Sequence, residues 1–165
     1  MSKLAIATAV LLGYVVQASV VPFIAIWGVR PDLLLVVLVH AALMRGPTTG
    51  VIVGFASGFL LDIASPQTLG ANALARSVVG FAVGHVWESV ERGSLLAGTL
   101  AVFGATLLHD VIYLAVIAMT THGSFPSSLL TLALPAAVYT TAVAAPLLML
   151  LGRFVRPRRA ARRAY

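Results

Sequence analysis

The 165-residue chain has no cysteine, which excludes disulfide bonds and thiolate metal sites. Charge is also scarce, since charged residues make up 10% of the sequence and only 5 are acidic. A soluble domain of this size cannot form a water-facing surface from so few charges. Hydrophobic residues make up 60% of the chain and its mean hydropathy is +1.02. The composition therefore predicts a protein that is embedded in a membrane.

Motifs of the common enzyme classes are missing as well. The chain has no nucleotide-binding loop, no zinc motif and no nucleophile elbow. No acidic residue is paired in sequence with a nucleophile or with an open metal position, so we expect neither catalysis nor a bound cofactor.

Six apolar segments can be drawn, at residues 4–26, 32–44, 48–63, 70–87, 94–119 and 128–151. A helix needs roughly 20 residues to cross a bilayer. The first segment is too long for a signal peptide and others follow it directly, which predicts an uncleaved span. The second and third are short, and they are either tilted helices or a hairpin that does not cross fully. We expect one transmembrane domain over residues 1–152, followed by a basic cytoplasmic tail over residues 153–165.

Positive charge predicts the orientation of these spans. With six spans and both termini in the cytoplasm, the inside carries Lys3, Arg45, Arg92 and the tail. The only basic residue in an outer connection is then Arg30, which satisfies the positive-inside rule. Five spans would place either Lys3 or the tail outside. We therefore expect an all-α bundle of six transmembrane helices with both termini cytoplasmic.

The tail holds most of the positive charge. Six of the 11 basic residues lie there: Arg153, Arg156, Arg158, Arg159, Arg162 and Arg163. Their main expected role is to keep the C-terminus in the cytoplasm. Six is more than orientation requires, and each basic residue near a membrane adds about 1 kcal/mol of attraction to anionic lipid. The tail is thus expected to bind lipid or an acidic cytoplasmic partner such as a filament, and not nucleic acid.

Small residues recur every four positions in two of the predicted spans. The positions are Gly50, Gly54 and Gly58 in the third span and Gly80 and Gly84 in the fourth. Such stripes form grooves that let another helix approach closely. They serve either packing within this bundle or docking of another membrane protein.

Ionisable residues inside the predicted spans are candidate functional sites, because charge at membrane depth is costly. Asp62, Arg76 and Asp110 all fall in the outer half of the predicted bundle, and His109 adjoins Asp110. We expect these four side chains to form one cluster, with the arginine between two carboxylates. The cluster either fixes helix register, carries protons or ions, or recognises a partner helix.

Three further polar residues have simpler expected roles. Asp32 follows Pro31 at the start of a span, where it can cap a helix N-terminus. Gln17 is expected to bond a neighbouring helix. His40, alone on an apolar helix, is expected to be a hydrogen-bonded packing residue and not a ligand.

Three sequence elements in this order resemble the MreD family of rod shape-determining membrane proteins. They are the motif Arg30-Pro31-Asp32 with its leucines, the bend Arg45-Gly46-Pro47, and the run from Gly54 to Asp62. The resemblance extends over the whole membrane region, and His109-Asp110 fits the family's polar position only loosely. It implies a non-enzymatic scaffold of the elongation complex in the bacterial inner membrane.

The implied partners are the membrane lipids, MreC, the glycosyltransferase RodA with its class B penicillin-binding transpeptidase, and indirectly the filament protein MreB. The family is also similar in fold to the substrate-binding S components of energy-coupling-factor vitamin transporters. An S component is therefore the alternative function, although the short outer loops have few aromatic residues to stack on a ligand. A proton-coupled transporter that uses Asp62 and Asp110 is a third possibility.

Overall fold

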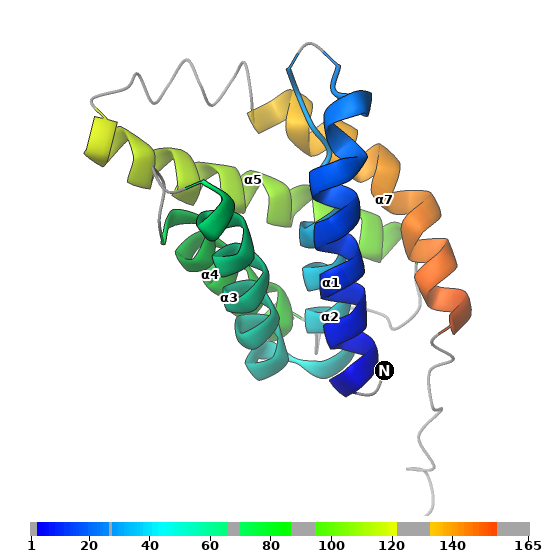
Figure 1. The fold of residues 1–165 in the computed structure, drawn as a ribbon. Coiled ribbons are helices and arrows are strands. Elements are labelled where there is room, and N and C mark those ends of the chain that lie inside the picture. The colour runs from blue at the N-terminus through cyan, green and yellow to red at the C-terminus, as the bar shows by residue number, and fades with distance from the viewer. Residues whose placement is uncertain (1–2, 27, 66–69, 87–94, 122–132, 155–165) are drawn as a thin grey trace, which may run out of the picture.

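The computed structural model describes residues 3–26, 28–65, 70–86, 95–121 and 133–154. Within these ranges the chain is helical, which confirms the predicted all-α class (Figure 1). The helices are α1 (Lys3–Ser19), a short 3-10 helix η1 (Val21–Ile24), α2 (Leu33–Arg45), α3 (Pro47–Ala64), α4 (Ala71–Val86), α5 (Leu95–Thr121) and α7 (Leu134–Phe154). Except for α1, they follow the apolar segments of the sequence closely, and residues 128–132 of the last segment lie outside the described residues.

Helix α2 is the centre of the bundle. It contacts α1, α3, α4, α5 and α7, and α1 lies in front of it in Figure 1. Its side chains are buried around the whole circumference, including Leu34, Leu35, Val36, Leu38 and Val39. A helix that is apolar on every side belongs in a core. This short segment is therefore the central helix of the bundle, a position that the sequence alone did not indicate.

A single glycine turns the chain from α2 into α3. Gly46 has a φ of +87°, which a side chain would disfavour, and its amide donates to the carbonyl of Ala42 at 2.8 Å. Pro47 then occupies the first turn of α3, where its missing N–H costs no hydrogen bond. The predicted bend at Arg45-Gly46-Pro47 is thus confirmed as a connection of one residue.

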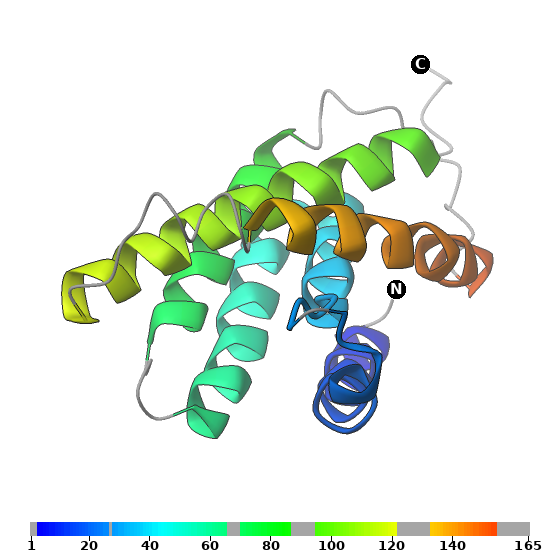
Figure 2. The same ribbon diagram turned by 90° about the horizontal axis from the view of Figure 1, so that it is seen from above.

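The glycine stripes of α3 and α4 face each other. A Cβ added to Gly50 would lie 2.1 Å from the carbonyl oxygen of Gly80, and one added to Gly54 would lie 2.3 Å from that of Arg76. Further along the pair, Gly58 lies against Ala73 and Gly84 lies against Pro47. Figures 1 and 2 show the two helices side by side along their length. The stripes therefore pack within the bundle, which is the first of the two roles that the sequence left open.

Helix α1 ends earlier than the first apolar segment does. It stops at Ser19, and Pro22 follows inside η1. Proline has no N–H and its ring clashes with the preceding turn, so an α-helix cannot continue through it without a break. The chain then reverses between Ile26 and Val29, whose backbone groups exchange hydrogen bonds of 3.0 and 2.9 Å. Residues 20–26 thus form a return towards α2 and do not extend the first helix.

Helices α5 and α7 lie side by side and cross the other helices at a steep angle (Figure 2). The sides of α3 and α4 that face away from the glycine contact expose large apolar side chains: Ile52, Phe55, Phe59, Ile63, Leu74, Val78 and Phe81. Apolar side chains on the outside with small residues inside are the pattern of helices surrounded by lipid.

Two of the described helices are long and apolar enough to cross a membrane, namely α3 and the stretch Leu96–Met119 of α5. The stretches Leu4–Ser19, Leu33–Arg45 and Leu134–Met149 are apolar but shorter. The six spans and the cytoplasmic termini therefore remain predictions. The same holds for the division into residues 1–152 and 153–165, because residues 155–165 lie outside the described ranges.

The glycine contact predicts the outcome of a matched pair of substitutions. Gly54→Ala should lower the free energy of unfolding by about 1–3 kcal/mol, because the new methyl group meets the backbone of α4. Gly104→Ala is the control, since nothing lies within 4 Å of its added Cβ. Thermal unfolding of both variants in detergent measures the difference, and equal midpoints would contradict the packing role.

Candidate functional site

A polar junction forms where α2 begins. It consists of Asp32 and the groups that bond to it and to its neighbours from α1, α4 and α7. Asp32 is the N-cap of α2, and its Oδ1 accepts a hydrogen bond of 2.9 Å from the amide of Leu35. An acidic cap satisfies a free amide and also favours the positive end of the helix dipole. The predicted capping role of Asp32 is confirmed.

Helices α1 and α7 reach this same point. Gln17 of α1 donates from Nε2 to the carbonyl of Pro31 at 3.1 Å, and its Oε1 accepts from the amide of Leu33 at 2.9 Å. The prediction that Gln17 bonds a neighbouring helix is therefore confirmed. From α7, the buried Oγ1 of Thr140 accepts from the amide of Asp32 at 3.1 Å. Both ends of the chain's helical region are thus tied to the start of α2.

The fourth contribution to the junction is an ion pair. Nη2 of Arg76, from α4, donates to Oδ2 of Asp32. The Arg76 side chain is 1% exposed and that of Asp32 is 18% exposed, so the pair is largely out of solvent. A charge buried in this way needs a partner, because its removal from water costs several kcal/mol. Asp32 supplies that partner while it also caps its helix.

This ion pair corrects the predicted partner of Arg76, which was expected to lie between Asp62 and Asp110. Asp62, Arg76 and Asp110 were expected at a similar depth, whereas Asp32 was expected only to cap its helix. Asp32 is predicted at that depth too, because α2 and α4 both start on the outer side in the predicted topology. That signal was present in the sequence and was missed, whereas nothing in the sequence marked Thr140.

Asp62 has a different role, at the start of α4. Its side chain is fully buried, and Oδ1 accepts from the backbone amide and the side-chain Nδ2 of Asn72 at 3.1 and 3.0 Å. Its Oδ2 accepts from the amide of Ala73 at 2.9 Å. The carboxylate at the end of α3 therefore satisfies the first amides of α4, where the helix dipole favours negative charge.

His109 and Asp110 form a third polar group. Nδ1 of His109 lies 2.9 Å from Oδ1 of Asp110, and the imidazole ring stacks on Tyr113 with centroids 5.8 Å apart. Asp110 also lines an open cavity of about 240 Å³ together with Arg30 and Tyr113. The four predicted cluster residues thus divide into three groups with different partners, and only His109 and Asp110 bond each other as expected.

His40 differs from its predicted environment. It was expected to be a hydrogen-bonded packing residue, yet its Nε2 is buried without a hydrogen-bond partner.

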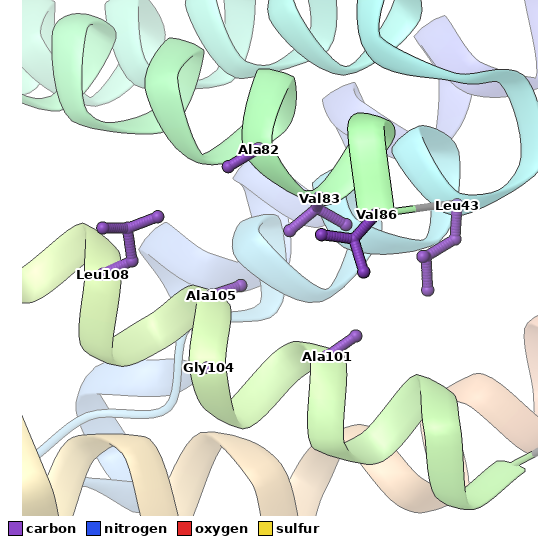
Figure 3. Close-up of a pocket in the computed structure, with 8 residues that line it drawn as sticks. All are labelled: Leu43, Ala82, Val83, Val86, Ala101, Gly104, Ala105 and Leu108. Atoms are coloured by element: carbon purple, nitrogen blue, oxygen red, sulfur yellow. The ribbon is translucent and has the colours of Figure 1, made fainter. Parts of the chain in front are cut away.

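An apolar groove separates α4 from α5 (Figure 3). Its volume is about 220 Å³, and its lining comes from three helices: Leu43 of α2, Ala82, Val83 and Val86 of α4, and Ala101, Gly104, Ala105 and Leu108 of α5. In Figure 3 the alanine, valine and leucine side chains of α4 and α5 project into the gap between these two helices. The lining offers contact to an apolar group and no charged side chain.

The remaining predicted site residues belong to the hairpin motif and to the basic tail. Arg30 and Arg45 are exposed, and Pro31 is buried at the junction. Of the tail arginines, Arg153 falls in the last turn of α7, and Arg156, Arg158, Arg159, Arg162 and Arg163 lie outside the described residues. The lipid and partner roles of the tail stay predictions.

The polar junction and the two other polar groups stabilise the fold. Their carboxylates accept hydrogen bonds from helix amides or from cationic side chains, which is how buried charges are stabilised. In the ranges that the structure describes, no three His, Asp or Glu side chains are grouped so that they could hold a metal ion.

The helices are apolar, they carry large apolar side chains on their outer faces, and their buried charges are bonded inside the bundle. These features are typical of a helical membrane protein. A model of the family described as rod shape-determining protein MreD matches residues 2–157. The chain therefore belongs to the MreD family, as the sequence motifs predicted. Neither a curated protein nor a solved structure matches the chain, so the expected likeness to S components remains a prediction.

The ion pair predicts the effect of a conservative substitution. Asp32→Asn keeps an oxygen that can cap α2 but leaves the buried Arg76 charge without its counter-ion. We expect a loss of about 3–5 kcal/mol in the free energy of unfolding, as for other broken buried ion pairs. The double variant Asp32→Asn, Arg76→Met should recover part of this loss. Additive losses in the unfolding free energy would show that the two side chains do not interact.

The α4 cap predicts a local effect for Asp62→Asn. In the variant, an NH₂ group replaces one of the two carboxylate oxygens, and an NH₂ group cannot accept a hydrogen bond. The backbone amide of Asn72 or of Ala73 therefore loses its acceptor. We expect a cost of about 1–3 kcal/mol and faster hydrogen exchange of the first amides of α4. Unchanged exchange in that turn, compared with Asp110→Asn as the control, would contradict the capping role.

Proposed function

We propose that this protein is a non-enzymatic scaffold of the bacterial rod-shape, or elongation, complex. It would cross the inner membrane six times, with both termini in the cytoplasm. The observation that carries the proposal is membership of the MreD family over residues 2–157. A supporting observation is that Asp32, Asp62 and Arg76 are bonded within the bundle, where they hold helices together.

A scaffold must keep its shape while partners bind and leave, and the described contacts suit that role. The backbones of α3 and α4 touch at several glycines, so the two helices cannot separate without losing this contact. The polar junction ties α1, α4 and α7 to the central α2. A bundle held in this way presents its outer faces in a constant arrangement.

The proposed partners are MreC, the glycosyltransferase RodA with its class B transpeptidase, and indirectly MreB at the cytoplasmic side. The glycine stripes are covered inside the bundle, so we assign partner contacts to other faces. The tail arginines would add attraction to anionic lipid or to an acidic cytoplasmic partner. Through these contacts the protein would support cell shape and peptidoglycan synthesis along the cell body.

The test is to crosslink native membranes briefly, extract this protein in mild detergent and identify what it captures. We expect MreC together with the cell-wall synthases. Capture of a coupling protein with its ATPases in place of MreC would contradict the scaffold and favour a vitamin transporter.

The Asp110→Asn variant adds a second comparison to this experiment. Asp110 bonds His109 and lines the outer cavity, so a transporter that uses it for protons would lose transport while its assembly stayed intact. In a scaffold, the variant would instead be disturbed in its folding or in its capture of partners. Its folding is checked by the elution profile of the detergent-solubilised protein.

A further inference from the structure

The open cavity beside the start of α2 is lined by two side chains of opposite charge. Its volume is about 240 Å³, and both Arg30 and Asp110 line it. Within the part of the chain that the structure describes, Arg30 forms no ion pair, and Asp110 is paired with the neighbouring His109. The two charges therefore share a cavity without neutralising each other.

Both charged side chains can form further hydrogen bonds. Arg30 is exposed, and its guanidinium carries several N–H donors in a planar fork that suits a phosphate group. The bond of Asp110 to Nδ1 of His109 uses Oδ1, and the Asp110 side chain is 19% exposed. Its Oδ2 takes no part in that bond, and an ionised carboxylate can accept several hydrogen bonds. The cavity wall thus offers donors to an anion and an acceptor to a cation.

A ligand that satisfies both charges must itself carry both signs. A simple cation would be attracted by Asp110 but repelled by Arg30, and the reverse holds for a simple anion. An ammonium group linked to a phosphate can meet the two side chains at once. One molecule of liquid water occupies about 30 Å³, so the cavity has room for about eight. That number is close to the number of non-hydrogen atoms in a phosphoethanolamine group.

The surroundings of the cavity are apolar. The rest of its lining is Gly28, Val29, Tyr113, Leu114, Ala133 and Ala136. The segments that form it also expose large apolar side chains: Ile26 before Gly28, Val111 on α5, and Leu134 and Val138 on α7. Apolar outer faces of this kind are typical of helices surrounded by lipid. A ligand at this place can therefore have its polar part in the cavity and its apolar part along the helices.

We propose that this cavity binds the zwitterionic headgroup of a phospholipid of the phosphatidylethanolamine type. The guanidinium of Arg30 donates to the phosphate, and the carboxylate of Asp110 accepts from the ammonium group. The acyl chains lie along the exposed apolar side chains of α5 and α7. In the proposed topology the cavity is on the outer side, so the lipid belongs to the outer leaflet. This binding does not depend on the scaffold role, and a failure to capture MreC would leave it unaffected.

The test is native mass spectrometry of the full chain, titrated in detergent with phosphatidylethanolamine and with phosphatidylcholine that has the same acyl chains. Both headgroups are zwitterionic, but methylation removes the N–H donors of the ammonium group. We expect phosphatidylethanolamine to bind about tenfold more tightly, as is typical for the loss of a hydrogen bond to a charged group. Equal affinity for the two lipids would overturn the proposal.

Free phosphoethanolamine distinguishes a lipid from a soluble ligand of the same chemistry. It carries the same two charges without acyl chains. We expect it to compete with phosphatidylethanolamine at least about tenfold more weakly than the lipid itself does, because it lacks the apolar contacts. Competition as strong as that of the lipid would identify a small soluble zwitterion as the ligand and would overturn the lipid assignment.

Matched variants test whether the lipid occupies this cavity. Asp110→Asn removes the negative charge, so the preference for phosphatidylethanolamine over phosphatidylcholine should disappear. Arg30→Gln should weaken the binding of phosphatidylethanolamine about tenfold, because the phosphate loses its cation. Arg45→Gln is the control, since Arg45 is also an exposed arginine but lies at the opposite end of α2. A preserved preference in Asp110→Asn, or unchanged affinity in Arg30→Gln, would overturn the proposal.

A variant that keeps every charge covers the case in which Asp110→Asn does not fold. Ala136→Leu adds volume in the lining of the cavity, so it should weaken the binding of phosphatidylethanolamine about tenfold. Val138→Leu is its control, because Val138 is 61% exposed on the same helix and does not line the cavity. Equal lipid affinity in these two variants would overturn the assignment to this cavity.

Discussion

The structure depends on the way in which the charges at the start of α2 are neutralised. Asp32 caps its own helix, accepts from Arg76 of α4 and, through its backbone amide, binds Thr140 of α7. Gln17 attaches α1 to the residues on either side. A buried charge restricts how the neighbouring helices can be arranged, because any other arrangement would leave the charge unpaired in an apolar medium. The order of the helices around α2 follows from this requirement.

Two kinds of contact thus hold the helices of the bundle together. Glycines bring the backbones of α3 and α4 into direct contact, which gives close packing but little information about register. The polar contacts supply that register, since hydrogen bonds have a short range and a preferred direction. Asp62 does so between the end of α3 and the start of α4, and the junction does so among helices that are distant in sequence. In this member of the MreD family, the arrangement leaves large apolar side chains on the outer faces of the helices.

The bend at Gly46 and the cap at Asp32 were both predictable, because each depends on neighbours in sequence and on the known preferences of Gly, Pro and Asp. The partner of Arg76 was not predicted correctly. Depth in the membrane allowed Asp32, Asp62 and Asp110 alike, and periodicity within one helix does not say which other helix it meets. Both oxygens of Asp62 accept hydrogen bonds from the start of α4, and Arg76 pairs with Asp32.

The sequence by itself determined that the chain is helical and apolar, where most helices begin and end, and which family it belongs to. Those properties reside in composition, in local turn chemistry and in motifs along the chain. Only the tertiary structure decided that the glycine stripes face each other, that the short α2 is the central helix and that Thr140 and Gln17 meet at its start. These are contacts between residues far apart in sequence, and the apolar helices look too much alike for a local pattern to specify them.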